Sequence, residues 1–348
     1  MSRRGLSVGI VGCGLIGAKR AQALGEHDRI VGCYDISAKA RSEFATAHGV
    51  PAFDDLAALL GARPDVVVAA VTHDALAATA ELALAAEANV LVEKPAGLGV
   101  AQIDRLIEAE RASGGRRVKV GFNHRFHPAL ARAAAEVGGG EHGELMFLRG
   151  RYGHGGRIGY EREWRALAER SGGGELVDQG MHLLDLAHWM AGPLPLHSAL
   201  LRTHFWDTEV EDNAALILGE PDSRSAPWAM LHVSWSEWKN LFSLEVYCRT
   251  AKLAVDGLGG SYGPETLRIY RMRPELGPPD LEEVAYPAED GSWRAEWEHF
   301  ADALEAGDGR LLLGDLADAR YAWQRIEDAY AGGPYAPMRE RIGVQALG

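Results

Sequence analysis

The stretch Leu6–Gly17, LSVGIVGCGLIG, decides the fold. A short apolar run over Leu6–Val11 leads into the glycine pattern GCGLIG at residues 12–17, and the helical pattern of Ala18–Leu24 follows it. Glycines at these positions permit a tight turn, a close approach of the backbone to a pyrophosphate, and close packing of the helix on the strand. The pattern alone is weak evidence, but a strand before it and a helix after it indicate a dinucleotide-binding unit.

The next apolar run ends in an acidic residue, where a dinucleotide-binding unit usually has one. Arg29–Tyr34 is followed by Asp35, roughly twenty residues beyond the glycines. A carboxylate at this place accepts hydrogen bonds from the adenosine ribose hydroxyls and repels a 2′-phosphate, so Asp35 favours NAD over NADP. Lys39 and Arg41 are close in the sequence, and they leave NADP possible.

Strands and helices then alternate. We expect helices at Ser37–His48, Asp54–Leu60, Asp74–Ala88 and Val100–Ser113, and strands at Asp65–Val71, Asn89–Val92 and Val118–Gly121. This alternation predicts a doubly wound parallel sheet, the Rossmann architecture. Ligands of such sheets bind at the carboxyl ends of the strands. The residues expected to contact the cofactor are therefore Gly12, Gly14, Leu15, Ile16, Gly17, Asp35, Thr72, His73, Glu93, Lys94 and Asn123.

After Gly121 the alternation gives way to a series of strands. We predict a cofactor domain over residues 1–122 and a substrate-binding and oligomerisation domain over residues 123–348, an α+β domain with a large, open, mostly antiparallel sheet. The expected strands are Glu144–Tyr152, Leu196–Trp206, Asn213–Leu218, Trp228–Trp238, Leu241–Arg249, Lys252–Val255 and Thr266–Arg271. Gly219–Pro227, Pro274–Asp290 and the C-terminal tail are expected to be loose. The closing helices, Trp293–Leu304 and Leu316–Tyr330, are expected to pack back towards the Rossmann domain.

A second glycine-rich stretch, Ser171–His188, carries groups suited to proton transfer. Its glycines allow unusual backbone angles and a close approach of another part of the chain. Asp178 and His182 are four residues apart, a spacing that places both on one face of a helix. A carboxylate beside an imidazole orients the ring and raises its basicity, as a general base requires. The same spacing fits an ordinary ion pair on a helix surface, and the pattern by itself leaves both interpretations open.

Substrate contacts are expected from Lys94 and from a polar, aromatic loop at Gly153–Arg170. Loops above a rigid site often carry specificity, although the aromatic residues of this loop equally suit packing on a surface. Lys94 either hydrogen-bonds a reacting oxygen or is simply exposed to solvent. The arginines either bind an anionic group of the substrate or form ion pairs within the protein. The full set expected at the substrate is Lys94, Arg125, Tyr152, His154, Arg157, Tyr160, Trp164, Arg165, Asp178 and His182.

Composition limits the partners and the location. The 348 residues are 47% hydrophobic and 24% charged, with a net charge of −13. That balance argues against nucleic acid and anionic membranes as partners. No apolar run reaches the roughly 18 residues of a membrane span, and no signal-peptide pattern is found. Cys13, Cys33 and Cys248 lack the spacing of metal ligands, so we expect a cytoplasmic protein with free thiols and no bound metal.

The sequence resembles the glucose–fructose oxidoreductase/inositol dehydrogenase family, often written Gfo/Idh/MocA, over nearly the whole chain. The matching pieces are GCGLIG at 12–17, EKP at 93–95, GFNHRFHP at 121–128 and GGGELVDQGMHLLDLAHW at 172–189. The resemblance implies that Lys94, Asp178 and His182 are catalytic, and that the back of the second sheet forms dimer or tetramer contacts. In a departure from the family pattern, Thr72-His73 stands where Thr-Pro is frequent, and Ala77 stands where a histidine is frequent.

The activity implied is hydride transfer between a nicotinamide and a secondary alcohol or ketone of a sugar, cyclitol or nucleotide sugar. His182 then takes or returns the hydroxyl proton, Lys94 hydrogen-bonds the same oxygen, and Asp178 holds Lys94 or His182 in place. Two alternatives remain open. One is an NAD-dependent glycosidase or lyase that oxidises its substrate transiently. The other is a redox-inactive dinucleotide sensor, which should have lost one of the three residues.

Overall fold

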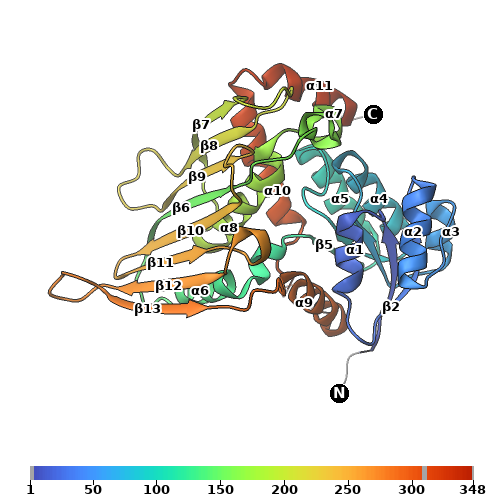
Figure 1. Cartoon of the computed structure of the whole chain (residues 1–348), viewed down its shortest axis with the longest axis horizontal. Coiled ribbons are helices and arrows are strands. Elements are labelled where there is room, and N and C mark those ends of the chain that lie inside the picture. Colours follow the sequence, from blue (N-terminus) through green and yellow to red (C-terminus); the bar gives the residue numbers. More distant parts are fainter. Residues whose placement is uncertain (1–3, 308–311, 347–348) are drawn as a thin grey trace. The chain divides into compact units, whose positions relative to one another are not determined.

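The computed structural model describes residues 4–307 and 312–346. The chain forms two compact units (Figure 1). The first takes in the chain up to Asn123 together with Trp293–Arg320, and the second takes in His124–Ser292 and Tyr321–Gln345. None of the helices in the described part of the chain combines the length and the apolar character needed to cross a membrane.

The first unit contains a five-stranded parallel sheet in the order β2-β1-β3-β4-β5. β1 and β3 are buried at every residue, as expected for central parallel strands covered on both faces. The fold therefore confirms the doubly wound α/β prediction. The strands are β1 Ser7–Val11, β2 Arg29–Tyr34, β3 Val66–Ala69, β4 Asn89–Val92 and β5 Val118–Val120; the helices between them are α1 Leu15–Gln22, α2 Ala38–His48, α3 Leu56–Gly61, α4 His73–Ala85 and α5 Val100–Ala112.

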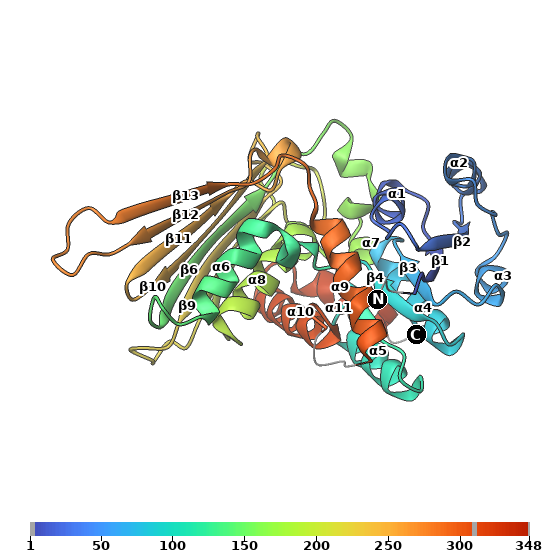
Figure 2. The same cartoon turned by 90° about the horizontal axis from the view of Figure 1, so that it is seen from below.

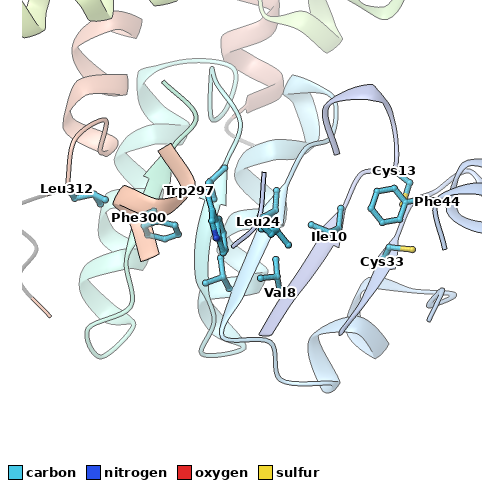
Figure 3. Close-up of a cluster of buried hydrophobic side chains, with 12 residues drawn as sticks. Val8, Ile10, Cys13, Leu24, Cys33, Phe44, Trp297, Phe300 and Leu312 are labelled. Carbon is cyan, nitrogen blue, oxygen red and sulfur yellow. The ribbon is translucent and has the colours of Figure 1, made fainter. Parts of the chain in front are cut away.

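A helix from late in the chain completes the core of this unit. In α9, Ser292–Ala306, Trp297 and Phe300 are at most 1% exposed and belong to the same cluster as Val8 and Ile10 of β1 (Figure 3). Burying one large aromatic side chain contributes about 2 to 3 kcal/mol. The core of the first unit therefore depends on residues far beyond the glycine pattern.

The second unit contains an eight-stranded sheet in the order β13-β12-β11-β10-β6-β9-β8-β7. Every neighbouring pair is antiparallel except β6 and β9, which run parallel. This confirms the prediction of a large, mostly antiparallel sheet. The strands are β6 Leu145–Gly153, β7 Leu196–Arg202, β8 Asn213–Leu218, β9 Trp228–Ser234, β10 Leu241–Cys248, β11 Ala251–Asp256, β12 Thr266–Arg271 and β13 Asp280–Ala285.

Helices cover one face of this sheet. Among the described residues, α6 Pro128–Gly138 and α8 Met181–Ala191 lie on one side and no helix lies on the other (Figure 2). The alternation along β9 matches this arrangement. Leu231 is buried under the helices, whereas its neighbour Met230 is 42% exposed on the open face.

Two stretches expected to be loose are regular, so that prediction was wrong there. β13 lies inside 274–290, and α11, Ala336–Ala346, lies in the C-terminal tail. β13 is an acidic edge strand held partly by charge, because Glu283 and Glu282 pair with Arg268 and Arg271 of β12. Cross-strand ion pairs stabilise a sheet without the apolar alternation by which strands are found in a sequence.

Candidate active site

The glycine pattern forms the turn between β1 and α1. Gly12 has φ 95°, and an added Cβ there would lie 2.2 Å from the carbonyl oxygen of Ala70. A Cβ on Gly17 would lie 1.9 Å from the carbonyl oxygen of Gly12, where α1 packs against the turn. By contrast, a Cβ on Gly14 would meet no protein atom within 4 Å. Gly12 and Gly17 are thus required by close contacts with the backbone of the protein itself. Gly14 instead leaves space at the N-terminus of α1, where a ligand can approach.

Asp35 stands beside this turn at the end of β2. Its Oδ2 accepts a hydrogen bond of 2.8 Å from the amide of Cys13, and its Oδ1 accepts one of 2.7 Å from the amide of Ser37. Arg41 donates to the carbonyl oxygen of Asp35 and pairs with Asp54. The carboxylate of Asp35 is therefore oriented by the backbone at the carboxyl end of β2.

The other residues expected at the cofactor all belong to the first unit and follow its strands. Thr72 is the N-cap of α4 and His73 its first residue, after β3. Glu93 and Lys94 follow β4, and Asn123 follows β5. Carboxyl ends of parallel strands share one edge of a sheet, so these residues collect at the edge that carries the glycine turn. In the turn itself, Leu15 is 74% exposed and Ile16 is half-buried.

A buried charge cluster supports the Glu93-Lys94 segment. Arg20 donates to Glu93 and to Glu296 of α9, each over 2.6 Å, and Lys119 donates to Glu296 over 2.8 Å. Burial alone would raise the pKa of Glu296, but the two cations outweigh it and lower the pKa. Removing one partner of such a buried pair typically costs about 3 to 5 kcal/mol. Glu93 is thereby fixed directly before Lys94.

The Asp178–His182 segment lies in the second unit and departs from a regular helix. Leu176–Gly180 forms a single π-helical turn, which continues into α8. Turns of this kind are frequent at functional sites. Asp178 lies in the turn and His182 lies at the start of α8, so the two are not on one face of a continuous α-helix as the spacing predicted.

Aromatic rings surround His182, which is 5% exposed. The imidazole of His124 stacks on it, with ring centroids 3.8 Å apart and an interplanar angle of 24°. Tyr152 of β6 lies 6.3 Å away by centroids. Burial, and then the neighbouring Tyr262, raise the pKa of the Tyr152 hydroxyl well above its usual value, so this phenol stays protonated. His182 is therefore held in a defined orientation by the rings packed against it.

The three arginines predicted to contact the substrate all face carboxylates. Arg165 Nε lies 3.4 Å from Asp178, and Arg157 donates twice to Glu163, each over 2.7 Å. Arg125 is buried and donates twice to Asp185, over 2.9 and 2.6 Å.

The loop residues differ in exposure. Tyr160 is 2% exposed and packs on Trp206 and Trp235, whereas Trp164 lies under the guanidinium of Arg165. His154 accepts a hydrogen bond from the amide of Gly156, and burial lowers the pKa of its imidazole.

Of the predicted substrate residues, Lys94 belongs to the first unit and the other members belong to the second.

Sequence reasoning did not single out His124, Glu211 or Tyr330. His124 stands in the NHR piece of the chain, and Glu211 begins the acidic pair Glu211-Asp212. Both members of that pair are fully buried. Adjacent acidic residues just before the apolar strand Asn213–Leu218 were the available signal, because a buried carboxylate must find donors.

Comparisons with known families cover both units. The model described as "Oxidoreductase family, NAD-binding Rossmann fold" matches residues 6–122, and the "GFO/IDH/MocA C-terminal domain" matches residues 130–254. A putative UDP-kanosamine synthase oxidoreductase subunit of Amycolatopsis mediterranei is 33% identical over 47% of this chain and 45% of its own length. Inositol 2-dehydrogenase of Salmonella typhimurium is 27% identical over 53% of this chain and 54% of its own length. The chain thus spans about half the length of these curated relatives.

Solved structures share the fold over almost the whole chain. UDP-N-acetylglucosamine 3-dehydrogenase from Acidithiobacillus ferrooxidans superposes with a TM-score of 0.80 at 21% identity, covering 95% of this chain and 99% of that one. Levoglucosan dehydrogenase superposes with a TM-score of 0.81 at 16% identity, covering 97% and 98%. At these identities the likeness establishes the fold alone.

Proposed function

Because the chain belongs to the GFO/IDH/MocA oxidoreductase family, we propose that it is an NAD(P)-dependent dehydrogenase or ketoreductase of a sugar or cyclitol. The observation that carries the proposal is the oriented, buried His182 beside the Asp178 turn, in a chain whose first unit is an NAD-binding domain. Gly12, Gly14, Gly17 and Asp35 would hold NAD, which supplies the hydride acceptor when bound.

The roles of the chain's own residues follow from their chemistry. His182 takes the proton of the substrate hydroxyl in oxidation and returns it in reduction, since an imidazole titrates near working pH. Lys94 donates a hydrogen bond to the same oxygen and stabilises its developing charge. Asp178 holds Lys94 or His182 in place, and its charge is balanced by Arg165, whose Nε lies 3.4 Å from its carboxylate. The surrounding rings exclude water from the imidazole.

The engaged arginines favour a substrate without a phosphate group. Arg125, Arg157 and Arg165 each face a carboxylate, so an anion would have to displace Asp185, Glu163 or Asp178. A polyol adds its hydroxyls to such pairs as donors and acceptors without breaking them. A nucleotide sugar, suggested by the name of the Amycolatopsis relative, is the second candidate and requires Arg157 or Arg165 to exchange partners.

A substrate screen tests the activity. Sugars, cyclitols and nucleotide sugars are offered with NAD and with NADP, and NADH formation is followed by absorbance. Net NADH from a neutral sugar or cyclitol supports the proposal. Product without net NADH indicates the transient-oxidation glycosidase or lyase, and NAD binding without turnover of any compound indicates the redox-inactive sensor.

Substitution of the base tests the mechanism. His182→Ala should lower kcat by about two to four orders of magnitude and leave NAD affinity unchanged. Lys94→Ala should lower kcat by a similar factor. His188→Ala is the matched control, because this histidine lies on the same helix but stacks on Tyr321. Near-normal turnover of His182→Ala would move the base to Lys94, Tyr152, His154 or Tyr160.

We also propose a cytoplasmic homodimer or homotetramer. Cys13, Cys33 and Cys248 are free thiols, which fits a reducing compartment. The open face of the second sheet is the proposed oligomer contact.

A further inference from the structure

Glu211, 37 residues beyond Gly174 in the sequence, holds the backbone at the start of the Asp178–His182 segment. Its side chain is fully buried. Oε1 accepts a hydrogen bond of 3.0 Å from the amide of Leu176, and Oε2 accepts one of 3.2 Å from the amide of Gly174. The hydroxyl of Tyr330, in α10 (Leu316–Ala331), donates to Oε2 over 2.7 Å. The backbone carbonyl of Glu211 also accepts from the amide of Glu175 over 3.0 Å.

The glycine run is shaped to admit this anchor. A Cβ on Gly174 would lie 1.9 Å from the carbonyl oxygen of Glu211. A Cβ on Gly173 would lie 2.2 Å from the hydroxyl oxygen of Tyr330. The close approach for which the glycines leave room is therefore the approach of Glu211 and Tyr330.

We propose that Glu211 is a positioning residue, whose carboxylate, held by Tyr330, fixes the turn that contains Asp178 and continues into the start of α8 at His182. It acts through the amides of Gly174 and Leu176 and need not touch the substrate. The proposal rests on the proposed function, in which Asp178 and His182 serve the reaction.

The hydrogen bonds of Glu211 favour its ionised form. All three of these side-chain contacts are donors, so the carboxylate accepts every one, whereas a protonated carboxyl must turn one of its oxygens into a donor. Burial acts in the opposite direction and raises the pKa of Glu211 to about 7. The titratable and charged groups around it are Tyr330 of α10, Glu175 at the turn, the adjacent Asp212, Tyr335 just before α11 and Arg339 within it. We therefore expect the hydrogen bonds that hold the turn to weaken as the pH falls below about 7, although the buried charge itself costs stability above that pH.

Hydrogen exchange tests the anchor without a substrate. Glu211→Gln keeps the shape but sets an NH₂ group against backbone donors. Peptides that cover 171–188 should then exchange about tenfold faster at one fixed pH above 7. Glu209→Gln is the matched control, because Glu209 accepts from the amide of Ala168 and pairs with Arg341, outside this segment. Unchanged exchange over 171–188 in Glu211→Gln would overturn the proposal.

Kinetics separate positioning from a purely structural role. With the substrate identified by the screen, kcat per folded Glu211→Gln enzyme should fall about tenfold with KM unchanged, and Tyr330→Phe should lose about threefold. Faster exchange with normal kcat would also overturn the proposal. If Glu211→Gln does not fold, Tyr330→Phe decides by both measurements, since it removes only the hydroxyl. His182→Ala is measured in parallel. Normal turnover of that variant would show that His182 is not the base, which contradicts the proposed function. The hydrogen-exchange result would still decide whether Glu211 anchors the turn.

Discussion

Asp35 contacts the glycine turn through one carboxylate oxygen and the start of α2 through the other. Its charge opposes a 2′-phosphate, so we predict tighter binding of NAD than of NADP. Asp35→Ser combined with Ile36→Arg should reverse the order by about tenfold or more, because it removes the repulsion and offers a guanidinium at a position that is 86% exposed. Fluorescence titration with both cofactors measures the change. Tighter binding of NADP to the unaltered protein would contradict the prediction.

Glu211 also makes stability depend on pH. Burial raises its pKa to about 7 in the folded chain from an ordinary value of 4.5, so the folded chain binds the proton more tightly than the unfolded chain. This contribution to stability is fully present below pH 4.5 and is lost as the pH rises through 7. Between about pH 5 and pH 8 the free energy of unfolding of the wild-type chain should fall by on the order of 2 kcal/mol, and that of Glu211→Gln should not show this fall.

Thermal unfolding of the two proteins in parallel across that pH range measures the difference. The comparison uses the slopes with pH rather than the absolute midpoints, because the glutamine also disturbs the hydrogen bonds. Parallel slopes would show that Glu211 titrates near its ordinary pKa.

At the scale of elements, the glycine run sets the path into the π-helical turn. Gly174→Ala places a methyl group where the carbonyl oxygen of Glu211 lies, so the run must shift. We expect a loss of about 1 to 3 kcal/mol together with a fall in kcat. Gly138→Ala is the control, since this exposed glycine at the end of α6 has no atom within 4 Å of an added Cβ. Alanine there should be neutral or slightly stabilising. Equal thermal midpoints for the two variants would refute the expectation.

At the scale of the whole molecule, the open face of the second sheet carries an apolar and aromatic surface. Phe147 stacks on Trp228 and on Tyr247, with centroids 5.1 and 4.2 Å apart, and Met230 is 42% exposed nearby on β9. Arg149 and Glu245 lie on the same face and pair with each other, so their charges are matched there. Exposed aromatic and apolar side chains on an open sheet mark an interaction site, and a second copy of the chain is the occupant that we propose. Light scattering at micromolar concentration should therefore show a dimer or tetramer.

Met230→Arg should shift that assembly towards the 37.6 kDa monomer, because it buries a charge in the contact. Ile158→Arg changes a side chain that is 99% exposed in a loop outside the sheet, and it should leave the assembly intact. Only a 37.6 kDa species from the wild-type chain would exclude the contact.

The sequence by itself determined the features that rest on local spacing. The glycine pattern, Asp35 and the alternation of apolar runs specify a parallel nucleotide-binding sheet, because each depends on neighbours within a few tens of residues. The same holds for the presence of Asp178 and His182 directly after a run of glycines. An apolar pattern, however, states that a face is buried and not which partner covers it.

Only the tertiary structure decided those partners. It brought Trp297 into the core of the first unit, placed β6 parallel to β9, and joined Arg125 to Asp185 across 60 residues. It also set Glu211 against Gly174, 37 residues away. A buried charged or polar group is paired with a residue that the fold brings close from a distant part of the sequence, so no local sequence pattern identifies its partner. β13 escaped prediction for the same reason, because its ion pairs exist only once β12 lies alongside it.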